Sequence, residues 1–401
     1  MPAPSIAKYF EFPRVKLTGQ RFTDEGSIIR VVPDKRFVPV CARCEAQTRR
    51  THSTKDRLIR DLNITDRRVW LQCEVRNLVC SDCGRIRVEK LEFVEAGERI
   101  TKRLARYVYD LCQRMPVIDV ARHTGLDPKT IKAVDKRFLT EDFGQIDFSG
   151  VHILGVDEIS ERKGRHYLTI VLNFETGQVL YVGKRRRART LKKFFRMLSR
   201  RQRRGIRAVV IDMWDPYIKA IRYYCPSARI VFDLFHVKKM FGKAICTVRN
   251  REYLHARRAD KAVLKGTRYL LLSNRENLNR RQTAHLDYLL QLNQNLATMH
   301  VLKEQLNVIW DQVTIVSAQQ ALQAWVCMAY ESKIREAIKF ARTLQRYSYG
   351  ILNHAMYPIH TGKLEGVNNR INVLKRRSYG YRDSYYFGLK IKQAFPGHQF
   401  N

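Results

Sequence analysis

The sequence has no long apolar run and, for its length, few acidic residues. No stretch of about eighteen uncharged apolar residues occurs in the chain, so no helix is predicted to span a membrane. The amino-terminal segment lacks a long apolar core and a small-residue cleavage site, so no secretion signal is predicted. Asp and Glu number 38 against 75 Lys and Arg, a formal charge of +37. Because such an excess makes a compact chain repel itself, it indicates a polyanionic partner, most simply nucleic acid.

A membrane-surface or ribosomal protein is the alternative for so basic a chain. Ribosomal proteins are usually shorter than 401 residues, and no basic amphipathic helix with bulky apolar anchors stands out. Apolar residues make up 45% of the sequence, enough to bury real cores, so the chain is predicted to be globular. Its length suggests about two to four domains.

The cysteines do not form a disulfide framework. Their number, nine, is odd. Four form two tight pairs, and the remainder are scattered: Cys73, Cys112, Cys225, Cys246 and Cys327. This distribution favours a metal site in a reducing cytosol over extracellular disulfides, so a cytoplasmic protein is expected.

The two cysteine pairs predict one structural zinc site. The pairs are Cys41-x-x-Cys44 and Cys80-x-x-Cys83, each on a turn-prone segment. A structural Zn²⁺ takes four thiolate or imidazole ligands in a tetrahedron, and a gap of two residues lets both thiolates of one knuckle reach the same ion. The alternative is four buried free cysteines. Two matched pairs favour a zinc ribbon.

A helix-turn-helix is predicted at residues 116–138. Gly125 allows a tight turn, Asp127 is a candidate N-cap, and Pro128 suits the first position of the next helix. A recognition helix over about residues 128–138 would carry four cations toward DNA: Lys129, Lys132, Lys136 and Arg137. The alternative is two ordinary packed helices, because the pattern is short.

The middle of the chain changes to strands. Residues 151–160, 165–184, 207–212 and 228–237 are rich in β-branched and apolar residues. Helices are predicted at residues 190–204 and 216–224, on either side of the third of these segments. Strands in a meander, followed by alternating helix and strand, predict a mixed sheet flanked by helices. Residues 238–349 contain no proline and predict an all-helical block, and a last helix is predicted from near residue 361 to a break at Gly380.

Carboxylates end two of the predicted strands. Asp157 and Asp212 would project together at one rim of the sheet, and with a third acid from a helix they could hold two Mg²⁺. Glu365 is the candidate third acid. Strand-end aspartates often only cap turns, and Glu158, Asp215 and Asp233 are rivals on the same reasoning.

Four sequence blocks resemble the ISL-type insertion-sequence transposases. The blocks are GVDEISERKGRHYLTIV, VVIDMWDPYIKAI, ARIVFDLFHVKK and GKLEGVNNRINVLKRRSYGYRD, and the paired cysteines and the helix-turn-helix precede them. These transposases belong to the DDE class and have a ribonuclease H-like catalytic core. The resemblance, over about residues 38–396, implies a catalytic triad of Asp157, Asp212 and Glu365, which binds two Mg²⁺ or Mn²⁺. It also implies a large all-α insertion between the second and third acids.

The DLFH block suggests further site residues. It is similar to the Asp-x-x-His signature that follows the second acid in Mutator and hAT transposases. Asp233 and His236 are therefore secondary catalytic candidates. A core histidine at a strand end is the alternative interpretation.

Two basic segments are candidates for contact with double-stranded DNA. Residues 184–204 carry many Lys and Arg and no acid, and such a run repels itself unless it meets phosphates. The second segment, residues 370–392, mixes cations with tyrosines, which suits a splayed or single-stranded DNA end. The DNA-binding candidates in or directly beside the two segments are Arg185, Arg186, Arg187, Asn369, Arg370, Lys375, Arg376 and Arg377.

The predicted protein is a multidomain α/β transposase. Its predicted parts are an amino-terminal extension (1–37), a zinc ribbon (38–92), a helix-turn-helix domain (93–147), the first part of a ribonuclease H-like core (148–240), a helical insertion (241–354), and the last core helix with a basic tail (355–401). It is expected to bind terminal inverted repeats, cleave the element ends and join 3′-hydroxyls to target DNA, as a homodimer or larger assembly on the bacterial nucleoid. The alternatives are a domesticated DNA-binding regulator without catalysis and a tyrosine recombinase.

Overall fold

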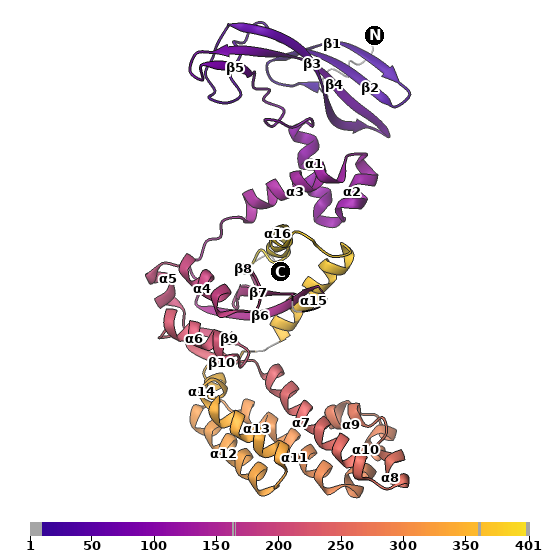
Figure 1. Ribbon diagram of the computed structural model, residues 1–401, viewed down its shortest axis with the longest axis vertical. Coiled ribbons are helices and arrows are strands. Elements are labelled where there is room, and N and C mark those ends of the chain that lie inside the picture. The colour runs from indigo at the N-terminus through magenta and orange to yellow at the C-terminus, as the bar shows by residue number, and fades with distance from the viewer. Residues whose placement is uncertain (1–9, 163, 165, 360–361, 398–401) are drawn as a thin grey trace. The chain divides into compact units, whose positions relative to one another are not determined.

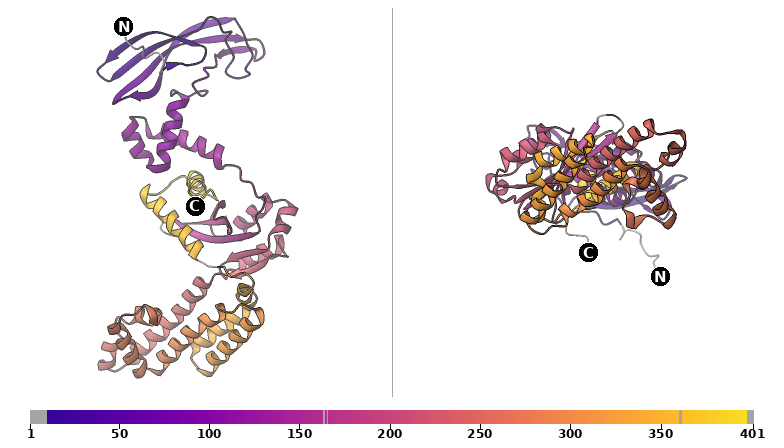
Figure 2. Two further views of the ribbon diagram at one scale, coloured as in Figure 1. Left: turned by 180° about the vertical axis from the view of Figure 1, so that it is seen from behind. Right: turned by 90° about the horizontal axis from the view of Figure 1, so that it is seen from below.

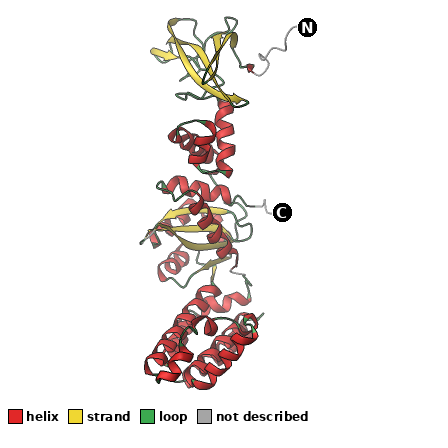
Figure 3. Cartoon of the chain, turned by 90° about the vertical axis from the view of Figure 1, so that its right-hand side faces the viewer, coloured by secondary structure: helices red, strands yellow, loops and turns green. Residues whose placement is uncertain are grey.

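The computed structural model describes residues 10–162, 164, 166–359 and 362–397 (Figure 1). The chain forms two compact units, residues 1–141 and 142–401. The strands gather in two sheets, one in each unit, and helices form the rest of the regular structure (Figures 2 and 3). Within the described part of the chain, no helix is both long and apolar enough to cross a bilayer.

The first unit begins with a twisted β-sheet. Its strands are β1 (Val15–Thr23), β2 (Gly26–Pro33), β3 (Thr51–Ile64), β4 (Arg67–Cys80) and β5 (Arg85–Val88). The order is β1-β2-β4-β3, with β5 pairing with β4. The amino-terminal extension predicted over residues 1–37 contains two strands of this sheet, β1 and β2, which were not predicted. Strand β2 pairs with β4, so its apolar residues Ile29 and Val31 complete the core that Leu71 and Cys73 form on β4.

The helix-turn-helix follows the sheet as predicted. Its helices are α1 (Lys102–Arg114), α2 (Val117–Thr124) and α3 (Pro128–Phe143). Gly125 ends α2 in the left-handed conformation, with φ of 71°. The Asp127 carboxylate then accepts a hydrogen bond of 2.8 Å from the Lys129 N–H, which caps the start of α3. Helix α3 extends beyond the predicted end because the buried Leu139 continues its apolar side.

The second unit is built on a mixed sheet. Its strands are β6 (Ile153–Arg162), β7 (His166–Asn173), β8 (Val179–Lys184), β9 (Ala208–Ile211) and β10 (Arg229–Phe232). The order is β10-β9-β6-β7-β8. Strands β6, β7 and β8 form an antiparallel meander, whereas β9 runs parallel to β6 and β10 runs parallel to β9. This is the mixed, ribonuclease H-like sheet that the sequence predicted.

Helices cover both faces of this sheet. Val156 and Val209 face one core, to which α4 (Ala188–Met197) and α6 (Asp215–Tyr224) contribute. Val210 and Ile170 face the other core, to which α15 (Gly362–Arg377) and α16 (Ser384–Ala394) contribute. The predicted start of α15 near Thr361 lies outside the described residues.

Two predicted elements differ from the structure. The helix predicted over residues 190–204 is two helices, α4 and α5 (Arg200–Gly205), because Ser199 starts the second with a capping box. The strand predicted over residues 228–237 stops at Phe232. There the Asp233 carboxylate accepts a hydrogen bond of 2.8 Å from the Phe235 N–H and starts α7 (Leu234–His255).

The predicted helical block is present between β10 and α15. After α7, its helices are α8 (Arg258–Leu264), α9 (Arg268–Leu272), η2 (Arg275–Asn277), α10 (Arg280–Leu292), α11 (Gln294–Trp310), α12 (Ile315–Glu331), α13 (Arg335–Arg346), α14 (Ser348–Leu352) and η3 (Asn353–Ala355). The block has a core around Phe241, Trp325 and Phe340, whose rings pack against one another. Its core is continuous with one face of the sheet.

Candidate catalytic site

The parallel strands β6 and β9 place two carboxylates side by side. Gly155 pairs with Val210 in the ladder between these strands, and Asp157 and Asp212 each lie two residues further along. Side chains two residues apart point to the same face of a sheet. Both acids therefore lie beside each other, as the sequence predicted. Asp212 directly follows β9, but the prediction that Asp157 ends a strand was wrong: β6 continues past Asp157 to Arg162 because this part of the strand still pairs with β7.

Strand β10 and helix α7 add a histidine to the two acids. The Asp233 N–H donates to the Ile211 carbonyl oxygen, which aligns the end of β10 with the end of β9. In the first turn of α7, His236 Nδ1 lies 2.6 Å from Asp212 Oδ1 and 3.1 Å from Asp233 Oδ2. Ligand atoms of Asp157, Asp212 and His236 all lie within 4.8 Å of one another. Among the described residues, this is the acid-containing cluster that could hold a metal ion.

The proximity of these groups changes their proton affinities. Burial and the neighbouring charge of Asp212 raise the pKa of Asp157 to about 6. Burial alone would lower the pKa of His236, but its hydrogen bonds to Asp212 and Asp233 outweigh that effect and raise the pKa to about 10. The positive charge of a protonated His236 offsets the repulsion between the carboxylates of Asp157 and Asp212. A divalent cation bound between these carboxylates could offset the same repulsion.

Arg186 lies inside the site, next to the carboxylates. Its Nε is 3.0 Å from Glu158 Oε1, its Nη2 is 3.6 Å from Asp212 Oδ2, and its guanidinium lies 4.6 Å from the centre of the Trp214 ring. Burial raises the pKa of Glu158 to about 7 even though Arg186 opposes that change. Neighbouring residues on the chain, Arg185 and Arg187, are exposed.

Helix α15 crosses strand β6 beside Asp157. Asn368 Nδ2 donates a hydrogen bond of 2.5 Å to Asp157 Oδ2, and Lys375 Nζ donates one of 2.7 Å to the Ser160 carbonyl oxygen. Glu365 stands three residues before Asn368, at an exposed position in the first turn of α15. It is not among the residues that the structure brings together with Asp157 and Asp212. It is the single acid of α15, the helix that contacts Asp157 through Asn368.

The rival carboxylates have other partners. Asp215 accepts hydrogen bonds of 2.6 Å from Arg346 and 2.8 Å from the Tyr347 hydroxyl, so it ties α6 to the helical block. Glu158 pairs with Arg186, and Asp233 caps α7 while it contacts His236. Each rival thus has a role in holding the site or the fold.

The four predicted zinc ligands form one cluster in the first unit. Cys44 Sγ lies 3.4 Å from Cys80 Sγ, Cys41 Sγ lies 3.9 Å from Cys83 Sγ, and all four sulfur atoms are within 4.8 Å of one another. Cys80 ends β4, and Cys83 lies in the turn that leads to β5. Backbone N–H groups of Arg43 and Cys44 overcome the effect of burial and lower the pKa of Cys41 to about 7. Four sulfur donors at these spacings fit a tetrahedral metal.

The predicted DNA-contacting residues differ in how exposed their side chains are. Lys129 is exposed, Lys132 and Lys136 are half-buried, and Arg137 pairs with Glu98 at 3.4 Å. The exposed members of the other basic segments are Arg185, Arg187, Asn369, Arg370, Arg376 and Arg377. Arg370 lies 5.1 Å from the centre of the Phe395 ring, so part of its side chain has a partner within the fold.

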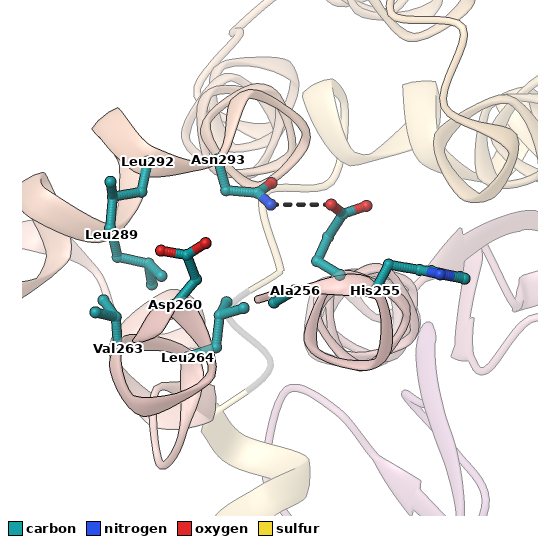
Figure 4. Close-up of a pocket in the computed structure, with 9 residues that line it drawn as sticks. His255, Ala256, Asp260, Val263, Leu264, Leu289, Leu292 and Asn293 are labelled. Atoms are coloured by element: carbon teal, nitrogen blue, oxygen red, sulfur yellow. Dashed lines mark hydrogen bonds between the residues drawn. The ribbon is translucent and has the colours of Figure 1, made fainter. Parts of the chain in front are cut away.

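A small pocket lies elsewhere, in the helical block (Figure 4). It has a volume of about 130 Å³ and is walled by Val263, Leu264, Leu289 and Leu292. On its rim, Asn293 Nδ2 donates a hydrogen bond of 2.9 Å to Glu252. That bond fixes the residue that caps α11, and the pocket shares no residue with the acid cluster.

Sequence reasoning overlooked two residues of the site. Asn368 was passed over for its neighbour Asn369, and Arg186 was grouped with the DNA-contacting cations of its segment. Helical spacing from Glu365 offered a signal for Asn368, since residues three apart lie on one side of a helix. No sequence signal separates Arg186 from the arginines beside it, because only the turn after β8 decides which one faces the acids.

Comparison with known proteins gives matches along most of the chain. A model of the ISL3 family in the DDE class, with the description "Transposase", matches residues 154–391. The helix-turn-helix domain of transposase family ISL3 matches residues 89–139, and the zinc-finger of the IS204, IS1001, IS1096 and IS1165 transposases matches residues 38–83.

Two curated relatives are similar to the chain over two thirds of its length or more. The transposase for insertion sequence element IS1001 of Bordetella parapertussis is 39% identical over 363 residues, which cover 90% of this chain and 89% of that protein. The transposase for insertion sequence element IS1557 of Mycobacterium tuberculosis is 26% identical over 295 residues, which cover 68% of this chain and 66% of that protein.

Proposed function

Because the chain belongs to the ISL3 family of transposases, we propose that it binds the terminal inverted repeats of an insertion sequence, cleaves DNA at the element ends and joins the 3′-hydroxyls to target DNA. The observation that carries the proposal is the parallel register of β6 and β9, which sets Asp157 and Asp212 side by side. Helix α15 reaches the same place through the hydrogen bond of Asn368 to Asp157.

The proposed catalytic ligands are Asp157, Asp212 and Glu365, which would hold two Mg²⁺ or Mn²⁺. The donor set fits these ions, because Mg²⁺ prefers carboxylate oxygens. When bound, such a pair activates the attacking water or 3′-hydroxyl and stabilises the leaving oxygen of the phosphodiester. Glu365 would join the acids from the first turn of α15, about 4.5 Å along the helix axis from Asn368.

The other residues of the site would position these ligands. Asn368 fixes one oxygen of Asp157, and the Glu158 N–H donates a hydrogen bond of 2.7 Å to the other. His236 holds Asp212 against Asp233. Arg186 would face the phosphate backbone of the bound strand, since Glu158 and Trp214 hold its guanidinium beside the acids.

The first unit would recognise the element ends. The cluster of Cys41, Cys44, Cys80 and Cys83 would bind one Zn²⁺ and join the hairpin of β4 and β5 to the loop before β3. Helix α3 would then approach a DNA groove with the exposed Lys129 at its start. Zinc content of one ion per chain, lost in Cys44→Ser, tests the metal assignment.

Nicking of labelled end DNA in the presence of Mg²⁺ tests the catalytic assignment. Asp157→Asn, Asp212→Asn and Glu365→Gln are each expected to abolish nicking and to leave end binding intact. Glu175→Gln is the matched control, because Glu175 is an exposed acid of the same unit and the substitution makes the same change in charge. A triad variant that still nicks with Mg²⁺ removes its residue from the triad. End binding without nicking by the unsubstituted chain would favour the domesticated regulator instead.

A further inference from the structure

One part of the helical block carries no charged side chain. Residues 313–330 contain no Asp, Glu, Lys or Arg, whereas charged residues make up 28% of the whole chain. A segment of this length would hold about five of them at that frequency. The segment comprises the end of the loop after α11 and nearly all of α12.

The exposed side of α12 is a continuous uncharged face. It is formed by Val316, Gln320, Gln323, Ala324, Cys327 and Tyr330, which are exposed. Their spacing along the sequence places them on one side of the helix. The opposite side is buried, with Trp325 and Leu322 in the core of the block. The fold therefore uses one side of α12 for packing and leaves the uncharged face to solvent.

Of the two long helices that pack against α12, α11 extends the uncharged face, whereas α13 exposes Arg335, Lys339, Arg342 and Arg346. Helix α11 packs against α12 (Figure 1), and its exposed residues include Val301, Gln305 and Val308. Between the two helices, Val313 exposes 85% of its surface. A valine side chain that is exposed to this extent buries little apolar surface within this chain.

DNA is a poor occupant for the uncharged face. Proteins bind DNA chiefly by neutralising phosphates with Lys and Arg, and this face offers neither. Protein interfaces have the opposite composition, because charged residues are depleted at their centres. The face thus fits a protein partner.

We propose that the uncharged face of α12 is the contact between two copies of this chain. The proposal rests on the proposed function, since two element ends must be held together. Each copy carries a formal charge of +37, so contact through most other surfaces would set cations against cations. In a two-fold contact the same surface meets itself, so apolar side chains meet apolar ones and glutamine amides can pair with each other.

Sedimentation velocity of the full-length chain tests the contact, with and without end DNA. The unsubstituted chain is expected to be a dimer. Ala324→Arg adds a guanidinium to the uncharged face of each copy and is expected to raise the dimer dissociation constant at least about tenfold. Gln291→Arg is the matched control, because it adds the same charge at an exposed position of α10. Circular dichroism melting checks that both variants fold like the unsubstituted chain.

Several outcomes would overturn the contact. They are a monomer under all conditions, equal dimerisation of the two arginine variants, or an effect of Ala324→Arg on the binding of a single end with no change in mass. Nicking of a single end, measured in parallel, separates the two proposals. If Ala324→Arg disrupts the dimer but the unsubstituted protein never nicks DNA, only the catalytic proposal is contradicted. If the protein nicks DNA but Ala324→Arg leaves its mass in solution unchanged, only the proposed contact is contradicted.

Discussion

At the scale of single residues, Asp157 shows how a site is assembled from distant parts of the chain. One of its oxygens accepts from the next backbone N–H and the other from Asn368 on α15. The position of Asp157 on an apolar strand was visible in the sequence. The partner was not, because hydrogen bonds between residues far apart in the chain leave no local pattern. The same is true of Arg186 and its contacts with Glu158 and Asp212.

The neighbours Asn368 and Asn369 are predicted to have different roles. Asn368→Ala removes the donor that fixes Asp157, so the nicking rate should fall at least about tenfold while end binding stays unchanged. Asn369 is exposed, and Asn369→Ala should instead weaken end binding a few-fold and leave the rate at saturating DNA unchanged. Single-turnover nicking and equilibrium binding of the same labelled end distinguish the two. Equal effects of both substitutions on either quantity would contradict the assignment.

At the scale of elements, local chemistry predicted starts and ends well where a cap or a turn residue was present. Gly125 and Asp127 stand at the predicted turn of the helix-turn-helix, and the structure confirms both. The errors arose where a polar residue interrupted an apolar run. Ser199 splits one predicted helix, and Asp233 converts the second half of a predicted strand into the start of α7. In both places the side chain satisfies backbone N–H groups, which periodicity alone does not reveal.

The turn at Gly125 gives a test at this scale. Gly125→Ala places a side chain on a residue with φ of 71°, and the new Cβ would lie 2.7 Å from the Arg68 guanidinium. The left-handed conformation costs about 1–2 kcal/mol for such a residue. Hydrogen-exchange protection of α2 and α3 should therefore fall about five- to thirtyfold.

A second glycine serves as the control for this test. Gly205 ends α5 and has nothing within 4 Å of an added Cβ. Gly205→Ala should keep or raise the protection of its own helix and leave α2 and α3 unaffected. Unchanged protection of α2 and α3 in Gly125→Ala would show that the turn does not need glycine.

At the scale of the whole molecule, charge determines which partners each part of the chain can accept. The formal charge of +37 is spread over both units but is absent from the uncharged face of α12. Basic surfaces suit DNA, and the uncharged face suits a second copy. One sequence thus separates the surfaces that bind nucleic acid from the surface that is proposed to bind protein.

The dependence of end binding on salt follows from this charge. A protein that contacts about 6–10 phosphates loses about 10³–10⁵ in affinity between 50 mM and 200 mM salt. The affinity of this chain for end DNA is expected to decrease by a factor within that range over the same change in salt. Lys129→Ala, at the exposed start of α3, should reduce the slope of log K against log salt by about 1. Fluorescence anisotropy across a salt series measures both, and Gln291→Ala, which removes no charge, is the control. A slope near zero would contradict DNA binding through phosphates.

The sequence by itself determined the order of the modules, the two cysteine pairs, the turn of the helix-turn-helix, the strand that carries Asp157 and the strand that leads to Asp212. These depend on interactions between residues close in the chain or on a period that the local backbone imposes. Only the tertiary structure decided that Asn368, Arg186 and His236 surround those acids, that β1 and β2 belong to the first sheet, and that α12 shows an uncharged face to solvent. Each of these depends on which distant segments pack together, and packing is set by the whole chain rather than by any window of it.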